Sequence, residues 1–326
     1  MAEQLPLFQD EYMLLNDGIA ALAALNLDAA VSSLHDYRDL YGSRGNVERL
    51  LAVAGALERG LASCPENGPE RPSRLFAFWN SFEASPQAGI LGNSDLISRI
   101  RISFFQLLTK TIEDEGTPDS ARLAPQIPVG YVHLQTGRHD RAIRSLQAAI
   151  AASPDNAAVY GYLGDAYFLR GEVNTARQVY LEACLIDPEA IDWDHLKDGT
   201  LSDLKGQLAE EYSYDESMAC LWLPSHAYVE SLFGLKRIRL MDEFKAFVER
   251  YLALAETARH DPSPAMDARL FLRGIVLCDN EPFLRLIKGM DFTDVRRRMK
   301  KANPSLFAGY LRRIGARQDR QPGRPV

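Results

Sequence analysis

Three histidine-aspartate pairs are the residues of this chain whose types could support hydrolytic chemistry. They are His35-Asp36, His139-Asp140 and His260-Asp261. Imidazole and carboxylate groups are ligands for divalent metal ions, and a bound metal can activate water. A metal site needs several such side chains converging on one point, but adjacent residues of a helix point about 100° apart. We therefore expect none of these pairs to be catalytic or to hold a metal.

Other signatures of chemistry are missing from the sequence. It has no phosphate-binding glycine loop, no dinucleotide fingerprint, no Gly-x-Ser-x-Gly elbow and no His-Glu-x-x-His helix. The four cysteines lie far apart without paired spacing, at Cys64, Cys184, Cys220 and Cys278. That spacing argues against a disulfide framework or a zinc knuckle and favours a reducing compartment. We expect a protein that is not an enzyme and that has no cofactor.

Basic residues near the C-terminus are the charge feature that could bind a partner. The chain has a net charge of −7, yet the stretch from Leu284 onward holds twelve Lys and Arg against three Asp. The candidate patch is Arg296, Arg297, Arg298, Lys300, Lys301, Arg312 and Arg313. One interpretation is a solvated helix face, because Phe292, Val295 and Met299 form a separate apolar stripe. The alternative is a site for an acidic partner, protein or nucleic acid, although no aromatic residues are interleaved for base stacking.

The elements that would position a site are clearest between Leu123 and Ala190, where one helical hairpin occurs twice with a period of 34 residues. The characteristic residues of the first copy are Gly130, Gly137, Ala142, Leu146, Ala149 and Pro154, and they recur as Gly164, Gly171, Ala176, Tyr180, Ala183 and Pro188. Small residues let two helices touch, glycine suits a left-handed turn, and proline ends a helix. The pattern resembles the tetratricopeptide repeat family. The resemblance implies an all-α superhelix of helical hairpins that binds a protein or peptide partner.

The resemblance also implies a binding surface, the concave face formed by the first helix of each hairpin. The corresponding positions are Ile127, Tyr131, Leu134, Gln135, Gly161, Tyr162, Asp165, Phe168 and Leu169. Members that grip the C-terminal carboxylate of chaperones have lysine and asparagine where this chain has Ile127, Tyr131 and Tyr162, which excludes that clamp here. Two alternatives remain open. Either an apolar or helical peptide binds in the groove, or flanking helices of the chain fill it, which the need of intact hairpins for packed neighbours favours.

Outside the two repeats the register weakens. Residues 11–44 fit it in a worn form, with Gly18 at the close contact, Leu34 at the apolar position and Leu25 replacing the turn glycine. The residues expected to cap the second helices of the hairpins are Asp28, Asp140 and Asn174. Residues 65–122 do not fit, because Leu108 falls where alanine is needed, and we expect a helical insertion that packs against the repeats.

The stripe formed by Phe76, Trp79 and Phe82 could be a ligand box, but core packing is the favoured interpretation. Residues 86–93 are predicted to be a loop and 192–206 a polar connector. The helices expected after the connector are 207–221, 225–236, 241–257, 264–278, 281–288, 292–301 and 304–314. The stripe within 241–257 is the most one-sided, and no segment alternates as a strand would.

The predicted organisation has five parts. They are N-terminal helices with a worn repeat at 1–64, the insertion at 65–122, two repeats at 123–190, a helical region at 191–317 and a disordered tail at 318–326. An acidic N-terminus without a long apolar run predicts neither a secretory signal nor a membrane span, so we expect a cytoplasmic protein. The predicted function is a non-enzymatic interaction or scaffold module. The alternative is an accessory or regulatory protein that binds an acidic partner through its basic C-terminal helices.

Overall fold

The computed structural model describes residues 4–44, 46–91, 95–123 and 126–319, and the side chains of residues 11–316 within those ranges. They form seventeen α-helices, two 3-10 helices and one antiparallel pair of two-residue strands. The fold is all-α, as the 34-residue period predicts. Within the described ranges, no helix is long and apolar enough to cross a membrane.

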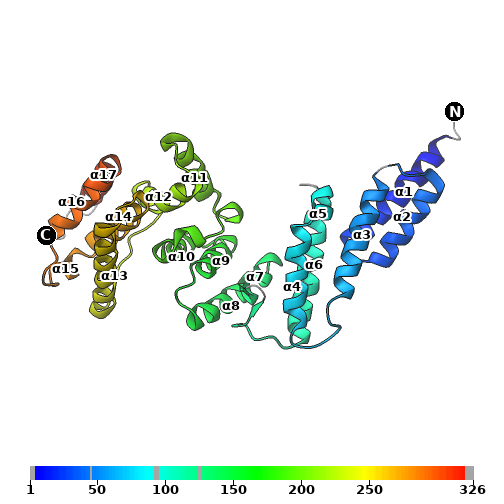
Figure 1. Cartoon of the computed structure of the whole chain (residues 1–326), viewed down its shortest axis with the longest axis horizontal. Helices are drawn as coiled ribbons and strands as arrows, with labels where there is room; N and C mark the ends of the chain where they lie inside the picture. The colour runs from blue at the N-terminus through cyan, green and yellow to red at the C-terminus, as the bar shows by residue number, and fades with distance from the viewer. Residues whose placement is uncertain (1–3, 45, 92–94, 124–125, 320–326) are drawn as a thin grey trace. The chain divides into compact units, whose positions relative to one another are not determined.

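The chain divides into two compact units, Met1–Ala152 and Ser153–Val326. The first unit holds α1 to α8 and the strands (Figure 1). Its elements are α1 (Gln4–Ala23), α2 (Leu27–Tyr41), α3 (Val47–Ala62), α4 (Arg71–Glu83), α5 (Pro86–Leu91), α6 (Asp95–Asp114), β1 (Arg122–Leu123), β2 (Ile127–Pro128), α7 (Val129–Gln135) and α8 (His139–Ala152). The first predicted repeat is the hairpin α7–α8 of this unit.

Aromatic side chains of α4 and α6 form the middle of the first unit's core. Phe76, Trp79 and Phe82 are all buried, and the ring of Trp79 stacks on Phe104 with centroids 4.5 Å apart. Stacked and edge-on aromatic pairs stabilise a core beyond the area that they bury. The stripe of α4 is therefore core packing and not a ligand box.

The second unit holds α9 to α17, and the second predicted repeat is its hairpin α9–α10. Its elements are α9 (Ala157–Leu169), α10 (Val173–Ile186), two 3-10 turns at Pro188–Ala190 and Trp193–His195, α11 (Gly199–Tyr212), α12 (Glu216–Val229), α13 (Met241–His260), α14 (Pro264–Asp279), α15 (Glu281–Leu284), α16 (Phe292–Ala302) and α17 (Pro304–Asp319). Residues 320–326 of the predicted tail lie outside the described residues.

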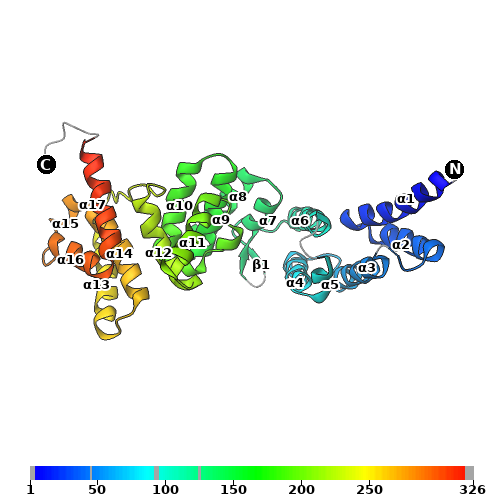
Figure 2. The ribbon, with the colours of Figure 1, turned by 90° about the horizontal axis from the view of Figure 1, so that it is seen from above.

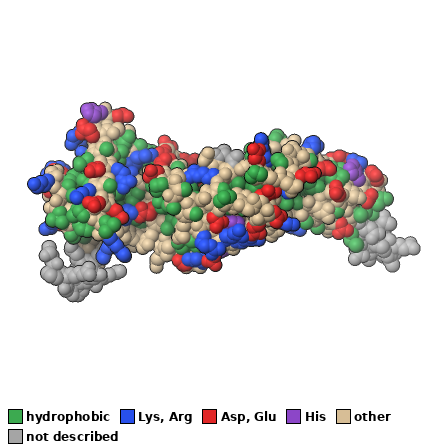
Figure 3. Space-filling model, turned by 90° about the horizontal axis from the view of Figure 1, so that it is seen from below, with side chains coloured by type: hydrophobic (Ala, Val, Ile, Leu, Met, Phe, Trp, Pro, Cys, Tyr) green, Lys and Arg blue, Asp and Glu red, His purple; other side chains and the backbone are tan. Residues whose placement is uncertain are grey.

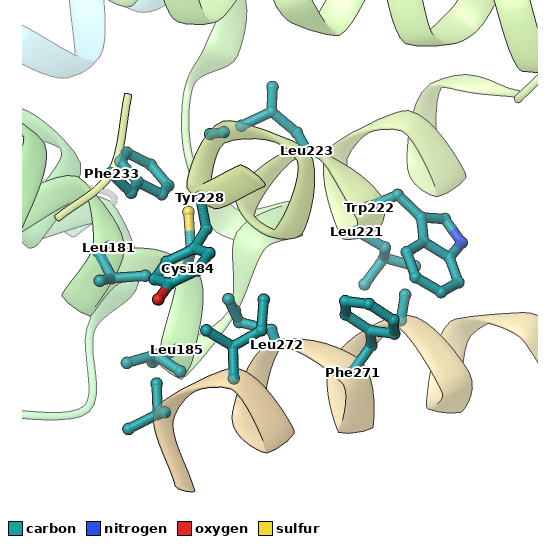
Figure 4. Close-up of a cluster of buried hydrophobic side chains, with 14 of the residues drawn as sticks. Leu181, Cys184, Leu185, Leu221, Trp222, Leu223, Tyr228, Phe233, Phe271 and Leu272 are labelled. Carbon is teal, nitrogen blue, oxygen red and sulfur yellow. The ribbon is translucent and has the colours of Figure 1, made fainter. Parts of the chain in front are cut away.

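Helix α12 forms the centre of the second unit's core. It contacts α10 through a cluster that includes Leu181 and Tyr228, and it contacts α14 where the rings of Trp222 and Phe271 meet edge-on, 5.7 Å apart (Figure 4). Ten consecutive residues of α12, from Ala219 to Tyr228, are buried. A helix that is buried on all sides lies inside its domain.

One close contact recurs in three hairpins, each within its own unit. A Cβ added to Gly18 would lie 2.8 Å from Leu34, one added to Gly130 2.5 Å from Leu146, and one added to Gly164 2.3 Å from Tyr180. The partner stands 16 residues after the glycine each time. Such distances leave no room for a methyl group. The worn register predicted for residues 11–44 therefore gives a hairpin of the same type.

The turns of the three hairpins are also alike. The residues at the left-handed position are Leu25, Gly137 and Gly171, with φ of 56°, 71° and 88°. In the first repeat, Gly137 N donates to Leu134 O and Arg138 N donates to His133 O, and the same two bonds occur at equivalent positions of the other two hairpins. This pair of bonds is the Schellman motif that ends many helices. Leu25 therefore holds a backbone conformation that normally requires glycine.

The helix caps differ from the prediction. The side chain of Asn26 caps α2 instead of Asp28, α8 begins at His139 so that Asp140 lies inside its first turn, and Asn174 lies inside α10. The Schellman turn brings the chain into the next helix within two residues. The predicted capping residue therefore falls two positions after the N-cap in each hairpin.

Four other predictions of secondary structure were wrong. Residues 86–91 form α5, and α11 begins at Gly199 inside the predicted connector, because the side chain of Asp198 caps it by accepting from Thr200 N. The predicted helices 207–221 and 225–236 are in fact α11 and α12 with shifted bounds. A proline inside a helix costs roughly 3 kcal/mol. Helix α12 nevertheless continues through Pro224, because the burial of Pro224 and its neighbours offsets this cost. Strands of two residues are too short to show alternation.

Candidate functional site

The predicted concave positions of the first repeat belong to α7 and to the strand before it. Leu134 is buried in the first unit, while Ile127, Tyr131 and Gln135 are half-buried. The ring of Tyr131 lies edge-on to Phe76 of α4 and Phe105 of α6, with centroids 6.3 and 6.0 Å away. The helices of the predicted insertion therefore cover the Tyr131 side of α7.

The predicted concave positions of the second repeat lie on α9. Asp165 is 6% exposed, and its Oδ1 accepts hydrogen bonds from Tyr180 Oη at 2.7 Å and from Lys197 N at 2.9 Å. Burial raises the pKa of Asp165 to about 6, because the charged carboxylate loses its hydration. Asp165 thus joins α9, α10 and the segment after them, and its carboxylate is used inside the second unit.

The segment from Ile191 to Asp198 lies against the same side of α9. The side chain of Ile191 is 3.5 Å from the position of a Cβ on Gly161, and Arg177 Nε of α10 donates to the buried carboxylate of Asp198 at 2.7 Å. Burial, followed by the charge of Asp192, raises the pKa of Tyr162 to about 12. The predicted concave side of α9 therefore faces the chain's own connection to α11.

The remaining concave positions of α9 differ in exposure. Phe168 is half-buried against the core of the second unit, and Leu169 is 42% exposed. The structure thus uses Tyr131, Asp165 and Phe168 for packing within a unit. Among the nine predicted positions, Leu169 is the most exposed. The two repeats belong to different compact units.

The basic residues of the C-terminal region fall into two groups. Arg296 and Arg313 are half-buried and stack on rings, with Cζ 4.0 Å from the centroid of Phe292 and 3.8 Å from that of Tyr228. Arg313 also donates to the Phe233 carbonyl at 2.8 Å. Stacked guanidinium groups of this kind stabilise local packing. These two members of the predicted patch are structural.

Of the other five basic residues, Arg298 is half-buried and the remaining four are exposed. Arg297 pairs with Asp294 one turn earlier in α16. The other four are Arg298, Lys300, Lys301 and Arg312. Within the described residues, none of these four forms an ion pair. The predicted patch is therefore smaller than the sequence indicated, and it lies on α16 and α17.

A surface groove beside α16 was not predicted as a site. It lies between α13 and α16 in the second unit, has a volume of about 520 Å³, and is lined by Tyr251, Leu252 and Arg298 among others. The sequence did show its signal, because Leu252 belongs to the one-sided stripe of α13. Four members of that stripe, Phe244, Phe247, Val248 and Tyr251, are buried, whereas Leu252 is 48% exposed. Periodicity alone does not show which residue at the edge of a stripe stays uncovered.

Some titratable groups gather in ion-pair clusters, such as Lys205 with Asp194 and Glu216. No group of three His, Cys, Asp or Glu side chains in the described part of the chain could hold a metal ion. The three histidine-aspartate pairs lie on α2, at the start of α8 and at the end of α13. His133, which the sequence did not single out, is fully buried in α7, and neither ring nitrogen has a hydrogen-bond partner. Burial lowers its pKa to about 4.

Comparison with known proteins agrees with the hairpin geometry. Residues 130–191 match the model of the tetratricopeptide repeat family. Superkiller complex protein 3 of Mus musculus is 28% identical over 112 residues, which are 34% of this chain and 7% of that protein. Tetratricopeptide repeat protein 37 of Xenopus laevis is 28% identical over 137 residues, which are 41% of this chain and 8% of that protein.

The chain thus spans less than a tenth of the length of these two relatives. No solved structure matches it significantly. The glycine contacts and Schellman turns described above fall at the positions that the family's period requires, and two of the three hairpins lie within or at the edge of the matched residues. The chain therefore contains two hairpins, at residues 130–191, that match the tetratricopeptide repeat family in sequence and in geometry.

Proposed function

We propose that this protein is a non-enzymatic interaction module that binds a protein partner in the cytoplasm. The observation that carries the proposal is the architecture itself, in which paired helices present side chains on extended surfaces. Repeat proteins of this kind use extended faces to bind other chains. The names of the relatives support the same class of function.

The partner surface is proposed to lie outside the covered concave positions. Tyr131 contacts α4 and α6, and Asp165 bonds Tyr180 and Lys197, so a partner would have to displace the chain's own contacts to reach either. Opening such contacts would subtract from the binding free energy. This supports the filled groove over the open one, with binding on an outer face or in the second unit.

The test is recovery of a stoichiometric partner with the tagged native protein. We expect a protein that co-elutes with the full chain and binds it again after both are purified. A bait with Leu169→Asp, which changes the most exposed of the predicted concave residues, should recover the same partner. Loss of the partner with this bait would return the site to the concave face. If only the full chain itself were recovered, without any stoichiometric protein, the proposed function would be refuted.

A second candidate function is binding of an acidic partner by the C-terminal helices. The observation in its favour is that Arg298, Lys300, Lys301 and Arg312 have no ion pair within the described ranges. Nucleic acid would show binding that falls steeply with salt, because phosphate contacts release counterions. Failure of the purified chain to bind any single-stranded or duplex probe at roughly 50 mM salt would leave an acidic protein as the remaining form of this candidate.

A further inference from the structure

The groove between α13 and α16 has an apolar floor. Its lining includes Tyr251 and Leu252 of α13 and Val295, Arg298 and Lys301 of α16. Tyr251 and Val295 are 4% and 2% exposed and close the groove from below, while Leu252 is 48% exposed at its side. Figure 2 shows α13, α14 and α16 gathered in the second unit. The groove thus offers apolar surface that the described chain leaves in contact with solvent.

The groove is lined by four basic and three acidic side chains, so the net charge of its lining is +1. Glu256 accepts from Arg259 at 2.6 Å, and Asp294 pairs with Arg297. The carboxylate of Asp291 caps α16 by accepting from Thr293 N at 2.8 Å. Two lining cations, Arg298 and Lys301, have no ion pair within the described ranges. Within the described residues, the two cations without an ion pair thus lie on α16, and the carboxylate of Asp291, which has no ion pair either, lies at the N-terminal end of that helix.

The spacing of the lining residues gives the shape of the occupant. On α13 they run from Tyr251 to Arg259, and on α16 from Asp291 to Lys301. At 1.5 Å per residue these stretches are roughly 12 and 15 Å long, or two to three helical turns. Two ridges of helical side chains with a groove between them can accept the apolar stripe of a third helix.

We propose that this groove binds an amphipathic acidic helix of a protein partner, with its apolar stripe on Leu252 and its carboxylates toward Arg298 and Lys301. The inference rests on the proposed function and names the site and the chemistry of the partner. The apolar floor of the groove and the ion pairs around it favour a protein partner. Nucleic acid would need a continuous positive surface. On the face shown in Figure 3, basic side chains at the C-terminal end stand among acidic and apolar ones.

The test uses the full chain and three synthetic peptides of about 15 residues, the length of three to four turns. The first carries leucines at helical spacing on one face and glutamates beside them. The second has the same composition in scrambled order, and the third has lysine in place of glutamate. Fluorescence polarisation should give saturable binding of the first peptide, with the other two at least about tenfold weaker, since one lacks the stripe and the other has the wrong charge.

Matched variants locate the binding. The double variant Arg298→Glu with Lys301→Glu should weaken the first peptide roughly tenfold, because attraction becomes repulsion. Lys300→Glu with Arg312→Glu changes the net charge equally but lies outside the groove, and it should change binding less than about twofold. Leu252→Ala removes exposed apolar surface without entering the core and should also weaken binding. Circular dichroism of each variant confirms that it is folded.

The outcomes separate this inference from the proposed function. Failure of the wild-type chain to bind the first peptide, or equal binding of all three, would refute the groove while recovery of a native partner still supports an interaction module. Equal loss in the two double variants would assign the effect to net charge and refute the groove. If an RNA probe binds more tightly than the peptide and displaces it, the occupant of the groove is RNA and not an acidic helix. If self-association of the chain displaces the peptide, the occupant is a second copy of the chain.

Discussion

The two hairpins that share the 34-residue register solve the same packing problem with different chemistry. In α7–α8 an aliphatic side chain, Leu146, faces Gly130, and the neighbouring cover is aromatic, from α4 and α6. In α9–α10 a tyrosine, Tyr180, faces Gly164, and its hydroxyl needs a buried acceptor. That acceptor, Asp165, in turn takes a bond from Lys197 N. In the second hairpin the contact residue is thus tied by its hydroxyl to a buried carboxylate.

The largest expected effect concerns the aromatic side chains on the predicted concave faces of the two hairpins. Tyr131→Ala with Phe168→Ala removes one aromatic from each hairpin, and if internal packing is their role the two losses together should exceed about 4 kcal/mol of unfolding free energy. Urea unfolding of the double variant and of each single variant measures this. A summed loss within about 1 kcal/mol, accompanied by loss of a partner, would mean that these rings form an open binding surface instead.

The next effect distinguishes the hairpins by pH. His133 in α7 has a pKa of about 4 when folded and the ordinary 6.5 when unfolded, so the unfolded chain binds a proton first as pH falls. The neutral ring therefore makes its full contribution to the free energy of unfolding above pH 6.5. As pH falls from 6.5 to 4, the free energy of unfolding decreases by about 3 kcal/mol. Unfolding of the His133→Phe variant should lack this loss.

Asp165 in α9 should act in the opposite direction. Its pKa is raised to about 6 in the folded chain from an ordinary 3.8, so the folded state holds the proton over that range. Ionisation of Asp165 therefore lowers the free energy of unfolding as pH rises from 4 to 6. An unchanged pH profile in Asp165→Asn, measured beside His133→Phe, would contradict the buried environment of this carboxylate.

Glycine contacts give a smaller and sharper comparison. Gly164→Ala places a methyl group 2.3 Å from a rigid ring, whereas Gly130→Ala places it 2.5 Å from a leucine that can change rotamer. We expect losses of about 3 and about 2 kcal/mol, and Ala176→Leu, at a fully buried contact, should also lose about 1 to 3. Gly206→Ala in α11 is the control, because nothing lies within 4 Å of its added Cβ. It should be neutral or stabilising.

The smallest effect tests the turns. Gly137→Ala and Gly171→Ala meet no atom within 4 Å, so their cost is the left-handed backbone alone, about 1 kcal/mol each. Thermal unfolding of the two variants should show equal shifts in free energy. Unequal shifts would mean that the two Schellman turns differ in strain, which their matching hydrogen bonds argue against.

The sequence predicted the parts of the fold that depend on local contacts. Gly130 with Leu146 and Gly164 with Tyr180 were predictable because a 16-residue spacing returns the chain to the same level of the hairpin. The helix through Pro224 was not, because burial by helices distant in the sequence outweighs a local preference. Asp165 could be placed on α9, but not its bonds to Tyr180 and Lys197. The exposure of Leu252 depends on where α16 packs, which periodicity within α13 does not determine.

The boundary between the compact units falls at Ala152 and Ser153, between the two matched hairpins. During synthesis the first hairpin and the helices that cover it leave the ribosome before the second hairpin has been made. Contacts such as Tyr131 with Phe76 and Phe105 can therefore form in the nascent chain, without waiting for α9. The second hairpin differs, because the acceptor bonds of Asp165 are complete only after Lys197 has emerged. A repeat register that is uniform in sequence thus produces two hairpins that mature at different stages of translation.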